Sequence, residues 1–426
     1  MNLKISVQDM SRIKIQNFGP IRKGFLSETD KGEELGWINI NKVTVLIGAQ
    51  GAGKSTVAKL ISTLAWIEKA LMRGEISLEH IYRQGWFRER CAYQNIQQYL
   101  KKSTYIAYQG AGLNFEYRYG KITIEAFDPE VFKSPKIMYV PAERNLTSAV
   151  KNLEDLKGLP STLYTFAEEF TDAMSELTSS IDLPINDARI MYDSISETPI
   201  LSGKGYRINL SEASSGFQSL VPLFVVTRYL MGSIQSRDDN HRNPLSIKIS
   251  KKMRKEANEV LNNNKIAEGL KRIYLERLTS KYYYSLFFNI VEEPEQNLYP
   301  SSQRKVLNML LEFNNMRADN VLVLTTHSPY IVNYLTLAVK AGEISDKYRN
   351  VFTDELRNDF EKIIPAGASI SHNELTIYEL SEETGIIRML PNEYGIPSDD
   401  NWLNRELGNT NDLFSDLLLL QQKLSR

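Results

Sequence analysis

The sequence predicts an α/β fold built around a largely parallel sheet. Residues 43–47 form a β-branched run that ends at a glycine-rich loop, and a helical pattern of apolar residues follows from 55 to about 72. Two further buried-strand patterns, 285–291 and 321–325, enclose a helical segment. Strands that alternate with helices in this way are typical of a parallel sheet covered by helices.

The other elements follow from the same periodicities, in chain order. Residues 11–17 alternate polar and apolar side chains, as a half-buried strand does. We then expect a hairpin over 113–127, a strand at 136–140, mainly helix over 152–230 with a loop near 196–210, two strands at 374–379 and 385–390, and an amphipathic helix at 411–424.

Four segments describe the expected organisation. Residues 1–150 form one lobe with an insertion near 75–130, and 151–283 form a helical lobe that includes a basic segment. Residues 284–340 return to the first lobe and complete its sheet. Residues 341–426 form a small C-terminal extension.

Composition excludes several classes of protein. The chain has 426 residues, of which 42% are hydrophobic and 24% charged, so it is neither disordered nor of low complexity. The single cysteine excludes an intrachain disulfide and a four-cysteine zinc site, and the four histidines are too few and too scattered for a metal site built from histidines. The N-terminal residues lack the apolar core of a secretory signal, and no stretch reaches the length of a membrane span. We therefore expect a soluble cytoplasmic protein that does not contact membranes.

The loop after the first buried strand carries the strongest motif. Gly48-Ala-Gln-Gly-Ala-Gly-Lys-Ser-Thr56 fits the pattern G-x-x-x-x-G-K-[ST], and it lies between a strand and a helix as this phosphate loop requires. Glycines let backbone N–H groups surround a phosphate, and the helix dipole adds positive potential. Lys54 would reach the terminal phosphates and Ser55 would ligate Mg²⁺. The nucleotide-binding residues that we predict are Gly48, Gly51, Gly53, Lys54, Ser55 and Thr56.

Two acids and a histidine follow the other buried strands. Strand 285–291 runs into Glu292-Glu293, and strand 321–325 runs into His327. A carboxylate at the end of a strand beside a phosphate loop usually holds Mg²⁺, which assigns Glu292 to the metal. Glu293 would then polarise the attacking water, and His327 would bind the terminal phosphate or orient that water. Alone, the same residues would suit an acidic turn and a structural histidine.

A serine-glycine loop precedes an apolar helical pattern. Ser214, Ser215 and Gly216 stand where hydroxyls, N–H groups and a helix dipole together attract an anion. Ordinary helix capping gives the same pattern. The order of phosphate loop, serine-glycine loop, acids and histidine is what makes the phosphate interpretation specific.

This order resembles the ABC-type ATPase superfamily, which includes transporter ATPases, SMC and Rad50 heads, RecF and the OLD family. Ala213-Ser-Ser-Gly-Phe217 is similar to the ABC signature, Glu292-Glu293 to the Walker B acids and His327 to the switch histidine. The sequence Glu-Glu-Pro-Glu-Gln-Asn-Leu-Tyr-Pro looks most like the OLD/RecF-like bacterial ATPases described as "AAA family". The resemblance covers about residues 8–335.

The resemblance implies an ABC-ATPase head in which ATP lies between the phosphate loop of one chain and the signature of another. A head-to-tail homodimer, or a higher oligomer, is then the active form. Members of this group, such as the ATPase subunits of the PARIS and Septu systems, serve in phage defence, which implies a separate effector such as a nuclease or toxin.

Two positions depart from the family pattern. Glu292 stands where transporters and SMC heads generally have aspartate, which favours the OLD-like branch. No Q-loop glutamine is evident, and Glu143 or Arg144, directly after strand 136–140, would take its place as a nucleotide sensor.

Other functions remain open at this level. Segment 242–281 carries eleven Lys and Arg against four Glu, which suits either nucleic acid or a solvated helical face. A RecF-like DNA-repair ATPase is therefore the main alternative, and DNA is a candidate partner. A transporter subunit and a scaffold that binds ATP without hydrolysis are weaker alternatives. The chain lacks the acid pattern of a Toprim nuclease, so we expect ATPase activity without nuclease activity.

Overall fold

The computed structural model describes residues 11–29, 32–127, 132–150, 158–234, 255–262, 284–348 and 351–424. Most of the basic segment 242–281 therefore lies outside the described residues. None of the described helices is both long and apolar enough to cross a membrane.

An eight-stranded central sheet has the order β3-β2-β17-β16-β5-β15-β14-β9. Its strands are β2 (Gly24–Thr29), β3 (Gly32–Leu35), β5 (Val43–Gly48), β9 (Pro135–Val140), β14 (Leu286–Glu292), β15 (Val321–Thr326), β16 (Leu375–Leu380) and β17 (Ile386–Met389). The five strands from β16 to β9 are parallel to one another, whereas β17 is antiparallel to β16 and β3 to β2. The predicted α/β class and mixed, largely parallel sheet are confirmed.

Smaller antiparallel sheets flank the central one. Their strands are β1 (Arg12–Gln16), β4 (Ile38–Asn39), β6 (Tyr105–Gln109), β7 (Leu113–Arg118) and β8 (Lys121–Ala126) in one sheet, β10 (Ile181–Asp182), β11 (Arg189–Asp193), β12 (Thr198–Gly203) and β13 (Tyr206–Asn209) in a second, and β18 (Asn392–Glu393) and β19 (Ile396–Pro397) in a third. The hairpin predicted over 113–127 is confirmed as β7 and β8, which pair Arg118 with Lys121 at the turn.

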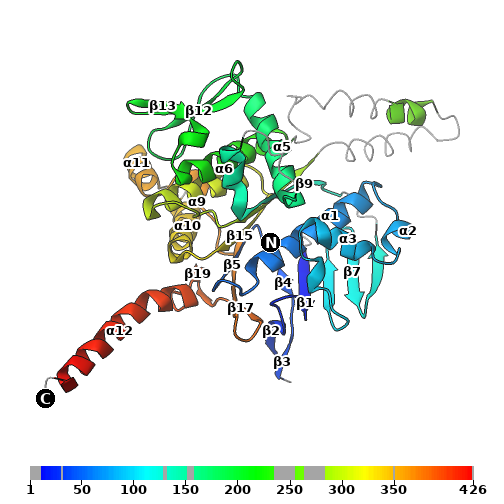
Figure 1. The fold of residues 1–426 in the computed structure, drawn as a ribbon, viewed down its shortest axis with the longest axis horizontal. Helices are drawn as coiled ribbons and strands as arrows, with labels where there is room; N and C mark the ends of the chain where they lie inside the picture. The colour runs from blue at the N-terminus through cyan, green and yellow to red at the C-terminus, as the bar shows by residue number, and fades with distance from the viewer. Residues whose placement is uncertain are drawn as a thin grey trace.

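Helices cover both faces of the central sheet. They are α1 (Lys54–Met72), α2 (Leu78–Ile81), α3 (Trp86–Tyr93), α4 (Leu146–Ala149), α5 (Ser161–Ser175), α6 (Ser215–Gly232), α9 (Pro300–Asn315), α10 (Pro329–Tyr348), α11 (Asp354–Ile363) and α12 (Trp402–Leu424), with short 3₁₀ turns η1 (Gln97–Tyr99), η2 (Ala142–Asn145), η4 (Leu210–Glu212) and η5 (Ala366–Ala368). Figure 1 shows α1, α3 and β7 on one side of β5 and β15, and α6, α9 and α10 on the other.

Side-chain alternation along the strands creates two apolar cores, one on each face. In β5, Val43, Val45 and Ile47 belong to the core that includes α5, α6, α9 and α10, whereas Leu46 belongs to the core beneath α1. In β14, Phe288 and Ile290 lie in the core beneath α1. Because strand side chains alternate with a period of two, Glu292 faces the α1 side of the sheet. The strand register therefore aims this carboxylate toward the loop that begins α1.

Three segments differ from the expected organisation. The region 152–230, expected to be mainly helical, contains the sheet β10–β13, and the expected loop near 196–210 is largely strands β12 and β13. Two turns of this sheet lie at residues with positive φ, Glu197 at +52° and Gly205 at +85°. These turns separate short strands. In the expected insertion near 75–130, β6 pairs with β1. Within the expected C-terminal extension, β16 pairs with β5, so this part completes the central sheet.

Candidate functional site

The phosphate loop connects β5 to α1, and three of its glycines have backbone conformations that other residues adopt only with strain. Gly48, Gly51 and Gly53 have φ of +143°, +82° and +99°, a region that other residues rarely adopt. A Cβ on Gly48 would collide with the carbonyl oxygen of Leu380, and one on Gly53 would lie 2.7 Å from Ile21 Cδ1. Close packing on both sides thus adds to the conformational requirement, and it holds the loop in one shape.

The first turn of α1 has the features of an anion-binding site. Gly53 occupies the N-cap, so no side chain caps the helix, and the first turn contains no acidic residue. The dipole and the first N–H groups of the helix therefore present positive potential at the loop. Ser55 is half-buried on this first turn, and Thr56 is buried beside it.

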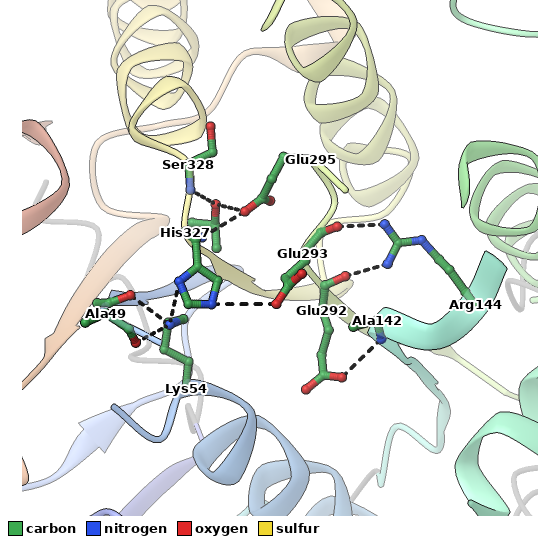
Figure 2. A network of polar contacts seen from close by, with 11 residues as sticks. Ala49, Lys54, Ala142, Arg144, Glu292, Glu293, Glu295, His327 and Ser328 are labelled. Carbon is green, nitrogen blue, oxygen red and sulfur yellow. Dashed lines mark hydrogen bonds and ion pairs between the residues drawn. The ribbon is translucent and has the colours of Figure 1, made fainter. Parts of the chain in front are cut away.

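Lys54 lies over its own loop. Its Nζ donates hydrogen bonds to the carbonyl oxygens of Gly48 and Ala49, both at 2.8 Å, and lies 3.2 Å from His327 Nδ1 (Figure 2). The side chain is only 4% exposed, and burial lowers the pKa of Lys54 to about 8, against the opposing charges of Glu293 and Glu295. A negatively charged ligand would stabilise the protonated ammonium and raise this pKa.

Glu292 ends β14 with one carboxylate oxygen unpaired. Oε2 accepts a hydrogen bond from the N–H of Ala142 at 3.2 Å, whereas Oε1 is buried without a partner among the described residues. The residue is 4% exposed. Burial, together with the neighbouring charge of Glu292, raises the pKa of Tyr139 well above its usual value. The hydroxyl of Tyr139 lies beside this carboxylate. A buried carboxylate is a suitable ligand for a hard cation such as Mg²⁺, and the hydroxyl of Ser55 on α1 is the second predicted ligand.

Glu293 adopts a strained backbone at the end of the strand. Its φ is +45°, and its N–H donates to the carbonyl oxygen of Thr325 at 2.9 Å. Its carboxylate Oε1 lies 3.6 Å from His327 Nε2 (Figure 2). Burial, followed by the charge of Glu292, raises the pKa of Glu293, and this brings the carboxylate closer to the range in which a general base works well.

His327 lies between Lys54 and Glu293. Burial and the nearby Lys54 charge lower its pKa, which favours the neutral ring at neutral pH. Because an ammonium group can only donate, Nδ1 of the neutral ring must accept from Lys54. The ring proton then resides on Nε2, directed at Glu293. With Lys54 protonated, this contact favours the Nε2-protonated tautomer and orients the ring, and the backbone of Gly48 is a further hydrogen-bond partner of the histidine.

Glu295 is a site residue that the sequence analysis missed. Its Oε1 accepts hydrogen bonds from Thr326 Oγ1 at 2.7 Å and from the N–H of His327 at 2.8 Å. It therefore holds the backbone from which the histidine projects (Figure 2). Its position as the third acid of Glu-Glu-Pro-Glu was the available signal, but the sequence does not fix the direction of an acid three residues beyond the end of a strand.

Arg144 binds the backbone of the two acids, Glu292 and Glu293. It is 1% exposed, and its guanidinium donates to the carbonyl oxygens of Glu292 at 2.7 Å and Glu293 at 2.6 Å. Further bonds reach the carbonyls of Pro141 and of Ser219 on α6. Burial lowers the pKa of Arg144 to about 10, so it stays charged at neutral pH. Arg144 thus links the segment at Pro141, the end of β14 and α6 through hydrogen bonds to their backbone carbonyls. Glu143, the other predicted sensor, is exposed.

The serine-glycine loop is placed differently from the other predicted residues. Ser214 is the N-cap of α6 and Ser215 its first residue, and both are exposed. At Gly216 a Cβ would lie 2.9 Å from the carbonyl oxygen of Asn297, so the loop packs closely against the segment after the acids. Among the described residues, no hydrogen bond or ion pair joins Ser214–Gly216 to the phosphate loop. The single chain brings together Lys54, the two acids and the histidine, and leaves the serine-glycine loop on its surface.

One family model matches part of the chain. A family described as "AAA domain, putative AbiEii toxin, Type IV TA system" matches residues 239–333, which include the two acids and His327. This agrees with the resemblance to ABC-type, AAA-described ATPases predicted from the sequence. The match covers less than a quarter of the chain and does not include the phosphate loop. Among curated proteins, no sequence match was found.

Several solved structures are similar to the chain at low identity. The SMC head domain from Thermotoga maritima is 10% identical, with a TM-score of 0.37 over 90% of this chain and 99% of that one. The ADP conformation of MJ1267, an ATP-binding cassette of an ABC transporter, is 12% identical, with a TM-score of 0.31 over 91% and 93%. The dimeric post-hydrolysis state of the cassette MJ0796 is 11% identical, with a TM-score of 0.27 over 88% and 96%. Because these TM-scores are below 0.5, the likenesses do not decide the function of this chain.

Proposed function

We propose that the chain is an ABC-type ATPase that binds ATP with Mg²⁺, hydrolyses it to ADP and phosphate, and acts as a homodimeric switch for a separate effector in phage defence. One observation carries the ATPase assignment. The neighbouring parallel strands β5, β15 and β14 end at one edge of the sheet, where Lys54, His327 and the Glu292-Glu293 pair meet. The carboxyl ends of parallel strands are where α/β sheets bind ligands.

Each residue then has a distinct role in this proposal. The loop N–H groups and Lys54 bind the phosphates, and Ser55 and Glu292 hold Mg²⁺, which neutralises phosphate charge when bound. Glu293 accepts a proton from the attacking water. His327, with its proton on Nε2 and its backbone held by Glu295, positions Glu293 and the terminal phosphate.

The exposed serine-glycine loop supports a site shared between two chains. Ser214 and Ser215 are exposed at the N-terminus of α6, and Gly216 beside them is half-buried. In a head-to-tail dimer they would meet the terminal phosphate bound by the other chain, so ATP would close the dimer and hydrolysis would open it. An effector would respond to this opening and closing of the dimer.

The defence role rests on the family match and on the resemblance of the motifs. The matched family is described in terms of an AbiEii toxin and a type IV toxin–antitoxin system, both of which imply control of a harmful activity. Protection against phage by the chain and its neighbouring gene would support the role, provided that Lys54→Ala abolishes the protection. The RecF-like alternative is favoured by the basic segment 242–281, and strong stimulation of ATP hydrolysis by DNA would select it instead.

Replacement of Lys54 by alanine tests the ATPase assignment itself. We expect phosphate release by the wild type and a loss of roughly 10²-fold or more in Lys54→Ala, because the ammonium is a main source of charge at the phosphates. Phosphate release under identical conditions is the measurement. Lys59→Ala, on the same helix beyond the loop, is the matched control and should retain wild-type activity. ATP binding without release by the wild type would contradict hydrolysis and favour a scaffold.

A further inference from the structure

Helix α12 carries an apolar surface that the described chain does not cover. It extends over Trp402–Leu424 and contains no buried residue. Its first turn is fixed to the head, because the N–H of Trp402 donates to Glu379 Oε1 at 2.6 Å and Leu403 packs against the apolar core. Beyond this turn the helix projects away from the molecule (Figure 1).

Leucines of the projecting part form a seam. Leu413, Leu417, Leu420 and Leu424 are 56%, 63%, 52% and 79% exposed. Their spacing of four, three and four residues is the a/d pattern of a coiled coil. In a coiled coil, a seam of this kind is covered by the matching seam of a second helix.

We propose that α12 pairs with α12 of a second copy of this chain, in antiparallel orientation and without a need for nucleotide. The leucine spacing allows a two-fold arrangement in which Leu417 faces Leu420 of the second copy. In the same register, Leu413 faces Leu424 of the second copy. Each of the four leucines then packs against a leucine of the second copy.

The charges beside the seam select the antiparallel orientation. Asp416 and Lys423 occupy equivalent positions on the same side of the leucine seam. In the antiparallel register, Asp416 lies within about two residues, or ~3 Å along the axis, of Lys423 of the second copy, and symmetry repeats the pair. A parallel pair would place Asp416 opposite Gln421 and would form no ion pair between these charges.

The pairing has a consequence that rests on the proposed function. Two heads joined through α12 would meet at a high effective concentration, so ATP would close an existing pair instead of collecting free chains. The pairing itself is independent of ATP, and its test contains no nucleotide.

The mass of the full chain in solution, measured over a concentration series without nucleotide, tests the pairing. We expect a dimer for the wild type and the 48.8 kDa monomer for Leu417→Asp/Leu420→Asp. Leu419→Asp, equally exposed but off the seam, should remain dimeric. Since α12 has no buried residue, none of these changes should unfold the head, and unchanged thermal melting checks this. A wild type that is monomeric throughout the series would overturn the proposal.

A charge exchange tests the orientation. Asp416→Lys and Lys423→Asp should each weaken the dimer, because each places like charges across the seam, and the double exchange should restore it. Disulfide formation gives a second test, since the native Cys91 is buried. A Leu413→Cys chain mixed with a Leu424→Cys chain should cross-link to it, and Leu413→Cys alone should not. Cross-linking of Leu413→Cys to itself, or a double exchange weaker than both single changes, would overturn the antiparallel pairing.

Discussion

Replacement of Glu293 by glutamine is expected to lower kcat for ATP hydrolysis by roughly 10²- to 10⁴-fold while leaving ATP binding intact. Glutamine keeps the size of the side chain but cannot accept the proton of the attacking water. The geometry assigns this role to Glu293 because its carboxylate faces His327 at 3.6 Å and its pKa is raised by burial and by Glu292. Lys54 and the loop are unchanged in the variant, so ATP should still bind.

The same variant should hold the closed dimer in the presence of ATP. The amount of nucleotide that remains bound as ATP measures this, together with the mass with ATP and Mg²⁺ of the same variant carrying Leu417→Asp/Leu420→Asp, which is expected to be monomeric without nucleotide. Glu383→Gln is the matched control, because Glu383 is exposed on the turn between β16 and β17. A Glu293→Gln protein that hydrolyses ATP at the wild-type rate would show that Glu293 is not the general base. One that neither retains ATP nor assembles would contradict the shared site.

Replacement of Arg144 by methionine is expected to cost stability and activity together. The change removes a side-chain donor from four carbonyl oxygens. Those of Pro141 and Glu293 keep a backbone donor, the N–H of residue 144 and of Gln296 respectively, whereas those of Glu292 and Ser219 lose the guanidinium. Buried polar groups that lose a partner cost about 1–3 kcal/mol each, and bonds to charged donors are at the upper end. We therefore expect a loss of about 3 kcal/mol or more and a fall in kcat, because the strand end that positions Glu293 loses its support.

Chemical denaturation and phosphate release measure the two effects. Arg144→Lys should lie between wild type and Arg144→Met, because lysine keeps the charge but cannot reproduce the planar arrangement of donors. Arg405→Met is the control, since its ion pair with Asp400 is exposed and contributes little to stability. An Arg144→Met protein with unchanged stability and unchanged kcat would show that the backbone bonds of Arg144 do not support the site.

The sequence could predict the parallel sheet and the residues that meet at its edge. Each motif directly follows a run that only a buried strand explains, and the carboxyl ends of neighbouring parallel strands converge. Lys54, Glu292, Glu293 and His327 therefore follow from local patterns plus one rule of topology. The direction of Glu292 is also fixed locally, because β14 alternates between the two cores.

The parts that were not predicted depend on long-range pairing. Strands β10–β13 are short, and their turn at Glu197 uses a residue without a strong turn preference. The position of β16 beside β5 joins residues more than 300 apart in the chain, which no local periodicity reports. Arg144 is similar, since its partners on β14 and α6 lie 75 to 149 residues away and are backbone atoms of no particular residue type.

The central claim is that one ATP site combines the phosphate loop of one chain with the serine-glycine loop of another. Mixed dimers of a Lys54→Ala chain and a Ser215→Arg chain test it most directly. The two chains are co-expressed with different tags, and mixed dimers are isolated by successive purification on both tags. In a two-fold symmetric dimer, one site of such a mixture carries both defects and the other carries none.

We predict that each variant alone is nearly inactive and that the mixed dimer regains about half of the wild-type phosphate release, because one of its two sites is intact. Mixed dimers of Lys54→Ala and Glu293→Gln are the control and should stay inactive, since both changes fall in the same half of the site and each site then carries one of them. Mixed Lys54→Ala and Ser215→Arg dimers that stay as inactive as the separate variants would contradict the shared site.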